Sequence, residues 1–91
     1  MEYLKAAINI TKRAHSHARI LNEKDPRNEV LKCEILNNLV YYLAVRGNKE
    51  DREIAMQGAE FVKERIEKYP KKSKAWQHTY DYVNTVYTNN P

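Results

Sequence analysis

Apolar residues recur three and four positions apart along most of the chain, a spacing that predicts amphipathic helices. Over residues 2–22, polar side chains occupy one face and apolar or small side chains the other. The stripe that we expect to be buried is Leu4, Ala7, Ile8, Thr11, Ala14, Ala18 and Leu21. No stretch of sequence alternates apolar and polar residues for long enough to predict a strand. The first predicted element is therefore a helix over residues 2–22.

Two prolines and a glycine divide the rest of the chain into segments of helical length. Because the residue before a proline avoids helical geometry, we expect a loop up to Pro26 and a helix over residues 28–46. Asn28 suits the N-terminal cap of this helix, and Gly47 suits the left-handed residue that ends it. Its expected inward positions are Val30, Leu31, Ile35, Leu36, Leu39, Val40, Leu43 and Ala44.

Two more helices are expected after the glycine. The third covers residues 49–69, with Asn48 as its cap. Its apolar stripe is Ile54, Ala55, Ala59, Val62 and Ile66. The fourth covers residues 73–88, with Ser73 as its cap. Its stripe is Trp76, Tyr80, Val83 and Tyr87.

Four helices joined by short loops predict one all-α domain over residues 1–91, in which neighbouring helices run antiparallel. Two arrangements satisfy this connectivity. One is an open stack of αα-hairpins, and the other is a closed four-helix bundle. The periodicity alone does not separate them, and the motif around Trp76, described below, favours the stack.

The composition excludes several kinds of functional site. A single cysteine forms neither an internal disulfide nor a cysteine-built zinc site, and two glycines are too few for a phosphate-binding loop. His15 and His17 would point about 200° apart on a helix, so they do not form a metal site. Cys33 lacks the local signature of a catalytic nucleophile. We therefore predict no metal, no cofactor and no enzymatic activity.

The apolar runs are too short for a membrane span. The longest run, Leu39–Val45, has seven residues, whereas a membrane-spanning helix needs about 20. Nothing in the sequence resembles a signal peptide. We expect no membrane partner and a cytoplasmic location.

The segment around Trp76 carries a more specific pattern. Trp76 lies six residues after Pro70 and is followed by Thr79, Tyr80 and Val83. This spacing resembles the first helix of a tetratricopeptide repeat, whose signature has Trp, then Leu-Gly, then Tyr. Tyr80 stands in place of the usual glycine. The resemblance implies a stack of antiparallel helix pairs.

The same register extends toward the N-terminus. Four residues fall at the spacing of the Ala-Phe-Ala-Pro that closes the second helix of such a pair: Ala14, Ala18, Leu21 and Pro26. Anchored on Gly47, the first-helix positions of the next pair are all apolar: Leu36, Leu39, Val40 and Leu43. Gly58 falls on a small second-helix position. The two prolines Pro26 and Pro70 lie 44 positions apart, whereas the family's period is about 34.

The resemblance implies a groove lined by the first helices of the pairs, here residues 28–46 and 73–88. The groove positions carried across are Glu34, Asn37, Asn38, Tyr41, Lys74, Gln77, His78 and Asp81. Asn38 and Lys74 fall on positions of the carboxylate clamp of some family members, but His78 stands where arginine is usual, and we predict no clamp. A polar groove with one aromatic residue suits an extended or helical peptide. We therefore predict a non-enzymatic scaffold module that binds a protein or peptide.

A basic nucleic-acid-binding domain is the alternative. The chain has a net charge of +4, and the candidate phosphate contacts are Lys5, Lys12, Arg13, Arg19, Lys71 and Lys72. However, the basic residues are spread along the chain, and the sequence contains no helix-turn-helix pair or zinc module. Protein binding is the preferred interpretation.

The repeat register leaves unpaired helices at both ends of the chain. Such ends expose apolar edges that neighbouring repeats or caps normally cover. Polar ends, closure of the fold, or pairing of two chains would each solve this problem. A homo-oligomer formed through the helix over residues 2–22 or the helix over residues 73–88 is one expected outcome.

Overall fold

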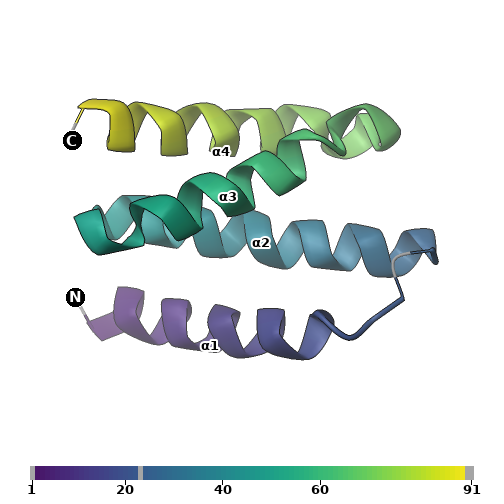
Figure 1. Cartoon of the computed structure of the whole chain (residues 1–91), viewed down its shortest axis with the longest axis horizontal. Helices are drawn as coiled ribbons and strands as arrows, with labels where there is room; N and C mark the ends of the chain where they lie inside the picture. The colour runs from purple at the N-terminus through teal and green to yellow at the C-terminus, as the bar shows by residue number, and fades with distance from the viewer. Residues whose placement is uncertain (1, 23, 90–91) are drawn as a thin grey trace.

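The protein, described here by a computed structural model, is all-α, as the sequence predicts (Figure 1). The structure describes residues 2–22 and 24–89. Its elements in chain order are α1 (Glu2–Ala18), α2 (Pro26–Arg46), the 3-10 helix η1 (Lys49–Asp51), α3 (Arg52–Lys63), the 3-10 helix η2 (Ile66–Lys68) and α4 (Pro70–Asn89). No strand occurs in these two ranges. Every helix in these two ranges is too short or too polar to span a bilayer.

Consecutive helices run antiparallel, and α2 lies at the centre of the stack (Figure 1). It packs against α1 on one side and against both α3 and α4 on the other. Within the described part of the chain, α1 and α4 make at most marginal contact. In a closed bundle with short loops, the first and fourth helices would be neighbours. The arrangement is therefore an open stack, in which α2 and α4 run parallel and pack against each other.

The core combines two clusters of side chains along α2. One joins Ile8 of α1 to Leu43, Ala59 and Tyr87. The other surrounds Trp76, which is 1% exposed, with Cys33, Leu36 and Val62. Gly58 allows a close approach of α2 and α3, because a Cβ added there would lie 2.6 Å from Cγ1 of Val40. The buried stripes confirm most of the predicted inward positions.

Two predicted core residues are wrong. Leu31 is 46% exposed and Ile54 is 56% exposed. The side of α3 that packs on α2 carries Ala55, Ala59 and Val62 instead, so Ile54 falls outside the contact. Leu31 lies on the side of α2 that α3 leaves uncovered.

Both predicted N-terminal caps beside the prolines are also wrong. The cap of α2 is Asp25, whose carboxylate accepts a hydrogen bond from the Arg27 amide at 2.9 Å, and Pro26 is the first helical residue. Asn28 instead donates from its side chain to the Asn22 carbonyl oxygen at 3.0 Å. Proline suits the first helical position because that amide has no partner within the helix.

The start of α4 and the end of α1 also differ from the predicted positions. Helix α4 starts at Pro70, so Ser73 lies inside its first turn and donates to the Pro70 carbonyl oxygen at 2.9 Å. Helix α1 ends at Ala18 instead of residue 22. Asn22 follows in a turn, where its side-chain oxygen accepts from the Lys24 amide at 2.9 Å. Side-chain bonds of this kind compete with helical hydrogen bonds.

The predicted helix over residues 49–69 is interrupted at both ends. Asn48 occupies the cap position with an extended backbone but makes no side-chain capping bond, and the chain passes through η1 before α3 begins. After Lys63 the chain tightens into η2. By contrast, the C-terminal cap of α2 is as predicted: Gly47 has φ 71°, and its amide donates to the Leu43 carbonyl oxygen at 2.8 Å.

Candidate functional site

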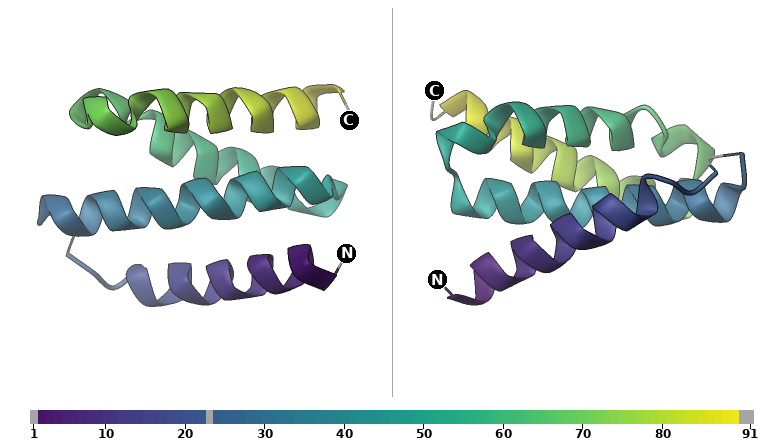
Figure 2. Two further views of the ribbon diagram at one scale, coloured as in Figure 1. Left: turned by 180° about the vertical axis from the view of Figure 1, so that it is seen from behind. Right: turned by 60° about the horizontal axis from the view of Figure 1, so that its bottom comes forward.

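One broad surface of α2 is left uncovered because α3 packs on the opposite side (Figure 2). Helix α1 lies along one edge of this surface and α4 along the other. We call it the rear face, since it is the one seen when the molecule is turned by 180° from Figure 1. The rear face contains two hollows, one along the contact of α2 with α4 and one along the contact of α2 with α1.

The contact between α2 and α4 has a parallel register that three pairs of residues define. The Glu34 carboxylate lies 2.7 Å from the Lys72 ammonium. About two turns further along α2 and nearly three further along α4, the rings of Tyr41 and Tyr82 lie 5.3 Å apart. Near the end of both helices, the Tyr87 hydroxyl donates to the Leu43 carbonyl oxygen at 3.0 Å. The two helices are therefore side by side along most of their lengths.

Between the first two of these pairs lies an open depression with a volume of about 540 Å³. We call it the α2–α4 depression, and its lining residues are Asn37, Lys71, Lys74, Ala75, His78 and Thr79. The Oδ1 of Asn37 is buried and has no hydrogen-bond partner among the described residues. Lys71, Lys74 and His78 are exposed around it. The depression thus presents cationic and hydrogen-bonding groups on one wall and an amide on the other.

The structure divides the predicted groove residues into separate groups. Asn37, Lys74 and His78 line the α2–α4 depression together. Gln77 instead lies at the contact between α3 and α4, where it accepts a hydrogen bond from Lys63 and donates to Asp81 at 2.9 Å. Glu34 is held by Lys72, and the Tyr41 ring lies beside the tilted ring of Tyr82. Asn38, although next to Asn37, lines the other hollow.

That second hollow was missed by sequence reasoning. It has a volume of about 380 Å³, we call it the α1–α2 groove, and its lining residues are Ala7, Ile10, Thr11, Ala14, Ile35, Asn38 and Tyr42. Most of these residues are apolar or small. The sequence signal for this groove was Ile10, an apolar residue outside the predicted buried stripe of its helix. In the structure Ile10 is 67% exposed.

The candidate phosphate contacts lie in two groups on opposite sides of α2. Lys5, Lys12 and Arg13 are exposed on α1, and Arg19 is exposed just after it. Lys71 and Lys72 belong to α4, which lies on the opposite side of α2 from α1 (Figure 1). Lys72 is also engaged by Glu34. Two separate basic edges result.

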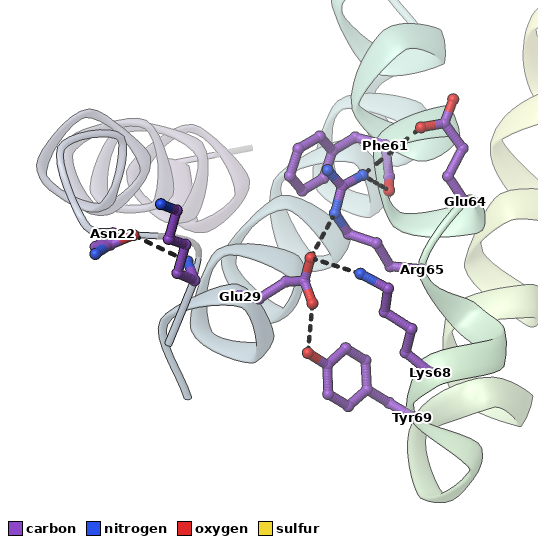
Figure 3. Close-up of polar contacts among 8 residues, drawn as sticks. Asn22, Glu29, Phe61, Glu64, Arg65, Lys68 and Tyr69 are labelled. Carbon is purple, nitrogen blue, oxygen red and sulfur yellow. Dashed lines mark hydrogen bonds and ion pairs between the residues drawn. The ribbon is translucent and has the colours of Figure 1, made fainter. Parts of the chain in front are cut away.

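A cluster of polar groups fixes the start of α2 to the segment before α4 (Figure 3). Glu29 is 7% exposed. One oxygen of its carboxylate accepts hydrogen bonds from the Nε of Arg65 at 3.2 Å and from the ammonium of Lys68 at 3.4 Å. The Tyr69 hydroxyl donates to its other oxygen. Arg65 also lies over the Phe61 ring, with its guanidinium carbon 3.5 Å from the ring centre. We call Glu29, Arg65, Lys68 and Tyr69 the Glu29 cluster.

The Glu29 cluster shifts the pKa values of both its acids. The hydrogen bond from Tyr69, with smaller contributions from Lys68 and Arg65, holds the pKa of Glu29 below its ordinary value of 4.5, although burial opposes this shift. The hydrogen bond to Glu29, together with burial, raises the pKa of Tyr69 to about 12. The hydrogen bond between Tyr69 and Glu29 is therefore most favourable when Glu29 is ionised and Tyr69 is protonated.

We predict two pH ranges in which the cluster stops stabilising the fold. The pKa of Glu29 is lowered on folding, so its contribution is present above pH 4.5 and is lost as the pH falls below that value. The pKa of Tyr69 is raised on folding, so its contribution is present below pH 10 and is lost as the pH rises toward 12. Urea unfolding measured across pH tests both, with Tyr69→Phe as the comparison. An equal loss of stability above pH 10 in Tyr69→Phe would contradict the second assignment.

Residues 2–22 and 24–89 contain no group of three or more His, Cys, Asp or Glu side chains placed to hold a metal ion. His15 is partly buried, and burial, then the nearby Arg19 and Lys32, lower its pKa. Comparison of the chain with protein-family models, with characterised proteins and with solved structures finds no match. The rear face is therefore the candidate functional site on the grounds of its shape and chemistry alone.

Proposed function

We propose that the protein is a non-enzymatic, cytoplasmic scaffold module that binds a segment of another protein on its rear face. The observation that carries this proposal is the α2–α4 depression, which Asn37 lines together with the exposed Lys71, Lys74 and His78. Groups that donate and accept hydrogen bonds in an open hollow suit a polypeptide, because its backbone and side chains offer both kinds of partner.

The likeness to tetratricopeptide repeats supports the same proposal. First helices of successive pairs would run parallel, as α2 and α4 do (Figure 1). The first-helix positions of the two pairs are buried in both helices: Leu36, Leu39, Val40 and Leu43 in α2, and Trp76, Thr79, Tyr80 and Val83 in α4. Tyr80 alone among these residues is only partly buried. In such a stack the surface of the first helices is the binding surface.

We predict that the full chain, immobilised, enriches peptides from a phage-displayed random library. The double variant Lys74→Glu/His78→Glu should lose that enrichment about ten-fold, because it reverses the charge of the α2–α4 depression. The control is Lys49→Glu/Gln57→Glu, which makes the same change of charge at exposed positions of η1 and α3. Equal enrichment by both double variants would contradict the assignment of the site.

Nucleic acid is the alternative ligand, and salt separates it from a peptide. Random-sequence DNA and RNA should bind the chain weakly, because the basic residues lie on two separate edges. Phosphate binding weakens steeply with added salt, since it releases counterions. Tight, salt-sensitive binding of either nucleic acid that is lost in a Lys5→Glu/Lys12→Glu variant would overturn the proposal in favour of a basic nucleic-acid-binding domain.

A further inference from the structure

The α1–α2 groove has the shape of a docking groove for a further helix. On α1 its lining residues are Ala7, Ile10, Thr11 and Ala14, and on α2 they are Ile35, Asn38 and Tyr42. Both sets repeat at three, four and seven positions, so each forms one ridge along its helix. Two antiparallel ridges leave a channel that accepts the side chains of a helix lying along them. The small side chains of Ala7 and Ala14 allow such a helix to approach closely.

The channel is apolar and open. Ile10 is 67% exposed beside it, and Leu31, on the same uncovered side of α2, is 46% exposed. Exposed apolar side chains that line one groove mark a binding surface more often than isolated ones do. The side chains that would fill this channel are therefore apolar ones, spaced as on the face of an amphipathic helix.

The charges on either side of the channel decide what flanks those apolar residues. On the α1 side, Arg13, which precedes the groove residue Ala14 in sequence, is exposed. On the far side of the rear face, Lys71 and Lys74 line the α2–α4 depression. The carboxylate of Glu34, on α2, is held by Lys72. Both edges of the rear face are therefore cationic, which favours an acidic ligand and disfavours a second copy of a chain whose net charge is +4.

We propose that the rear face binds an acidic amphipathic helix. The apolar side of this helix enters the α1–α2 groove, and its acidic side chains meet Lys71 and Lys74 on one side and Arg13 on the other. The inference rests on the proposed function and names the class of segment that the module takes. Asn37 and Asn38, adjacent on α2, then face the acidic and the apolar parts of the same ligand.

The test uses two synthetic helical peptides of about 18 residues, long enough to form four to five turns. Both carry leucine at positions repeating by three and four. The first carries glutamate at the flanking positions, and the second carries lysine there. Fluorescence anisotropy with the full chain should show the glutamate peptide binding about ten-fold or more tightly than the lysine peptide, because like charges face each other in the second complex.

A matched pair of variants locates the site. Ile10→Glu places a charge beside the α1–α2 groove and should weaken binding of the glutamate peptide by about ten-fold or more, since it removes apolar contact and adds repulsion. Ile54→Glu makes the same substitution at a residue that is 56% exposed on α3, and should leave binding within about two-fold. Neither site is buried, so both variants should fold.

Four outcomes would overturn the inference: no binding of the glutamate peptide, equal binding of the two peptides, equal effects of the two variants, or a dimer mass in light scattering that Ile10→Glu abolishes. The last would assign the groove to a second copy of the chain. If the phage selection succeeds but returns extended or basic peptides, the proposed function stands and this inference fails. If the phage selection yields no peptide and the glutamate peptide does not bind, both the proposed function and this inference fail.

Discussion

Trp76→Ala should lower the free energy of unfolding by about 3–5 kcal/mol, the usual cost of removing a fully buried tryptophan. The Trp76 side chain is 1% exposed and packs against Cys33, Leu36 and Val62, with the Tyr69 ring edge-on at 5.9 Å between ring centres. It holds the N-terminal half of α4 against α2. A domain of this size has about 5–15 kcal/mol of stability in total, so the variant should be partly or largely unfolded at 37 °C.

Urea unfolding followed by circular dichroism measures this effect. Trp76→Phe is the graded comparison and should cost less, because a ring remains in the site and the indole Nε1, which has no hydrogen-bond partner within residues 2–22 and 24–89, is removed. Lys74→Ala, two residues away and exposed, should change stability by less than about 0.5 kcal/mol. A loss below about 1 kcal/mol in Trp76→Ala would contradict the packing of α4 described here.

Glu29→Gln should be the second most damaging of the proposed substitutions, with a loss of about 1.5–3 kcal/mol. The neutral amide cannot accept charge-assisted hydrogen bonds from both Arg65 and Lys68, and it leaves the largely buried guanidinium without its counter-ion. Because these contacts join the start of α2 to the residues that precede α4, the loss should loosen that end of the stack first.

Glu34→Gln is the control, because it removes the ion pair between Glu34 of α2 and Lys72 of α4. Both side chains of this pair are more exposed than those of Glu29 and Arg65. Such pairs contribute about 0–1 kcal/mol. Unfolding of both variants at pH 7, with amide hydrogen exchange to locate the opening, distinguishes them. Equal losses in Glu29→Gln and Glu34→Gln would show that burial of the Glu29 cluster adds nothing to stability.

The helices and most of their buried faces follow from the spacing of apolar residues, but their ends do not. Pro26 and Pro70 signal a break in the chain, and the sequence interpretation assigned both to the preceding loops. Each is in fact the first residue of a helix, a position that proline also favours. Asp25 was the missed signal, because aspartate directly before a proline suits a helix cap.

Contacts between distant residues account for what the sequence could not predict. Glu29 meets Arg65, Lys68 and Tyr69 across 36 to 40 positions of sequence. Nothing in the local pattern selects this pairing, since all four residues also suit an exposed helical surface. The partners become defined only when α3 ends early and η2 turns back toward α2.

The candidate site was predictable in part. The repeat register placed Asn37, Lys74 and His78 on one surface, and they do line one depression. The register also assumed that Gln77 and Asp81 face the same way. Gln77 instead accepts a hydrogen bond from Lys63 of α3 and donates one to Asp81, an arrangement that depends on how α3 and α4 cross. The α1–α2 groove depends likewise on the packing of two helices and carries no motif.

Binding of a protein segment to the rear face is tested most sharply by a backbone amide NMR titration of the labelled chain. The ligand is a peptide enriched in the phage selection. Binding at the rear face predicts shift changes along α2 and around the α2–α4 depression and the α1–α2 groove, with the exposed side of α3 around Ile54 unaffected. Shift changes centred on α3, or on the basic residues Lys5 and Lys12 of α1, would contradict it.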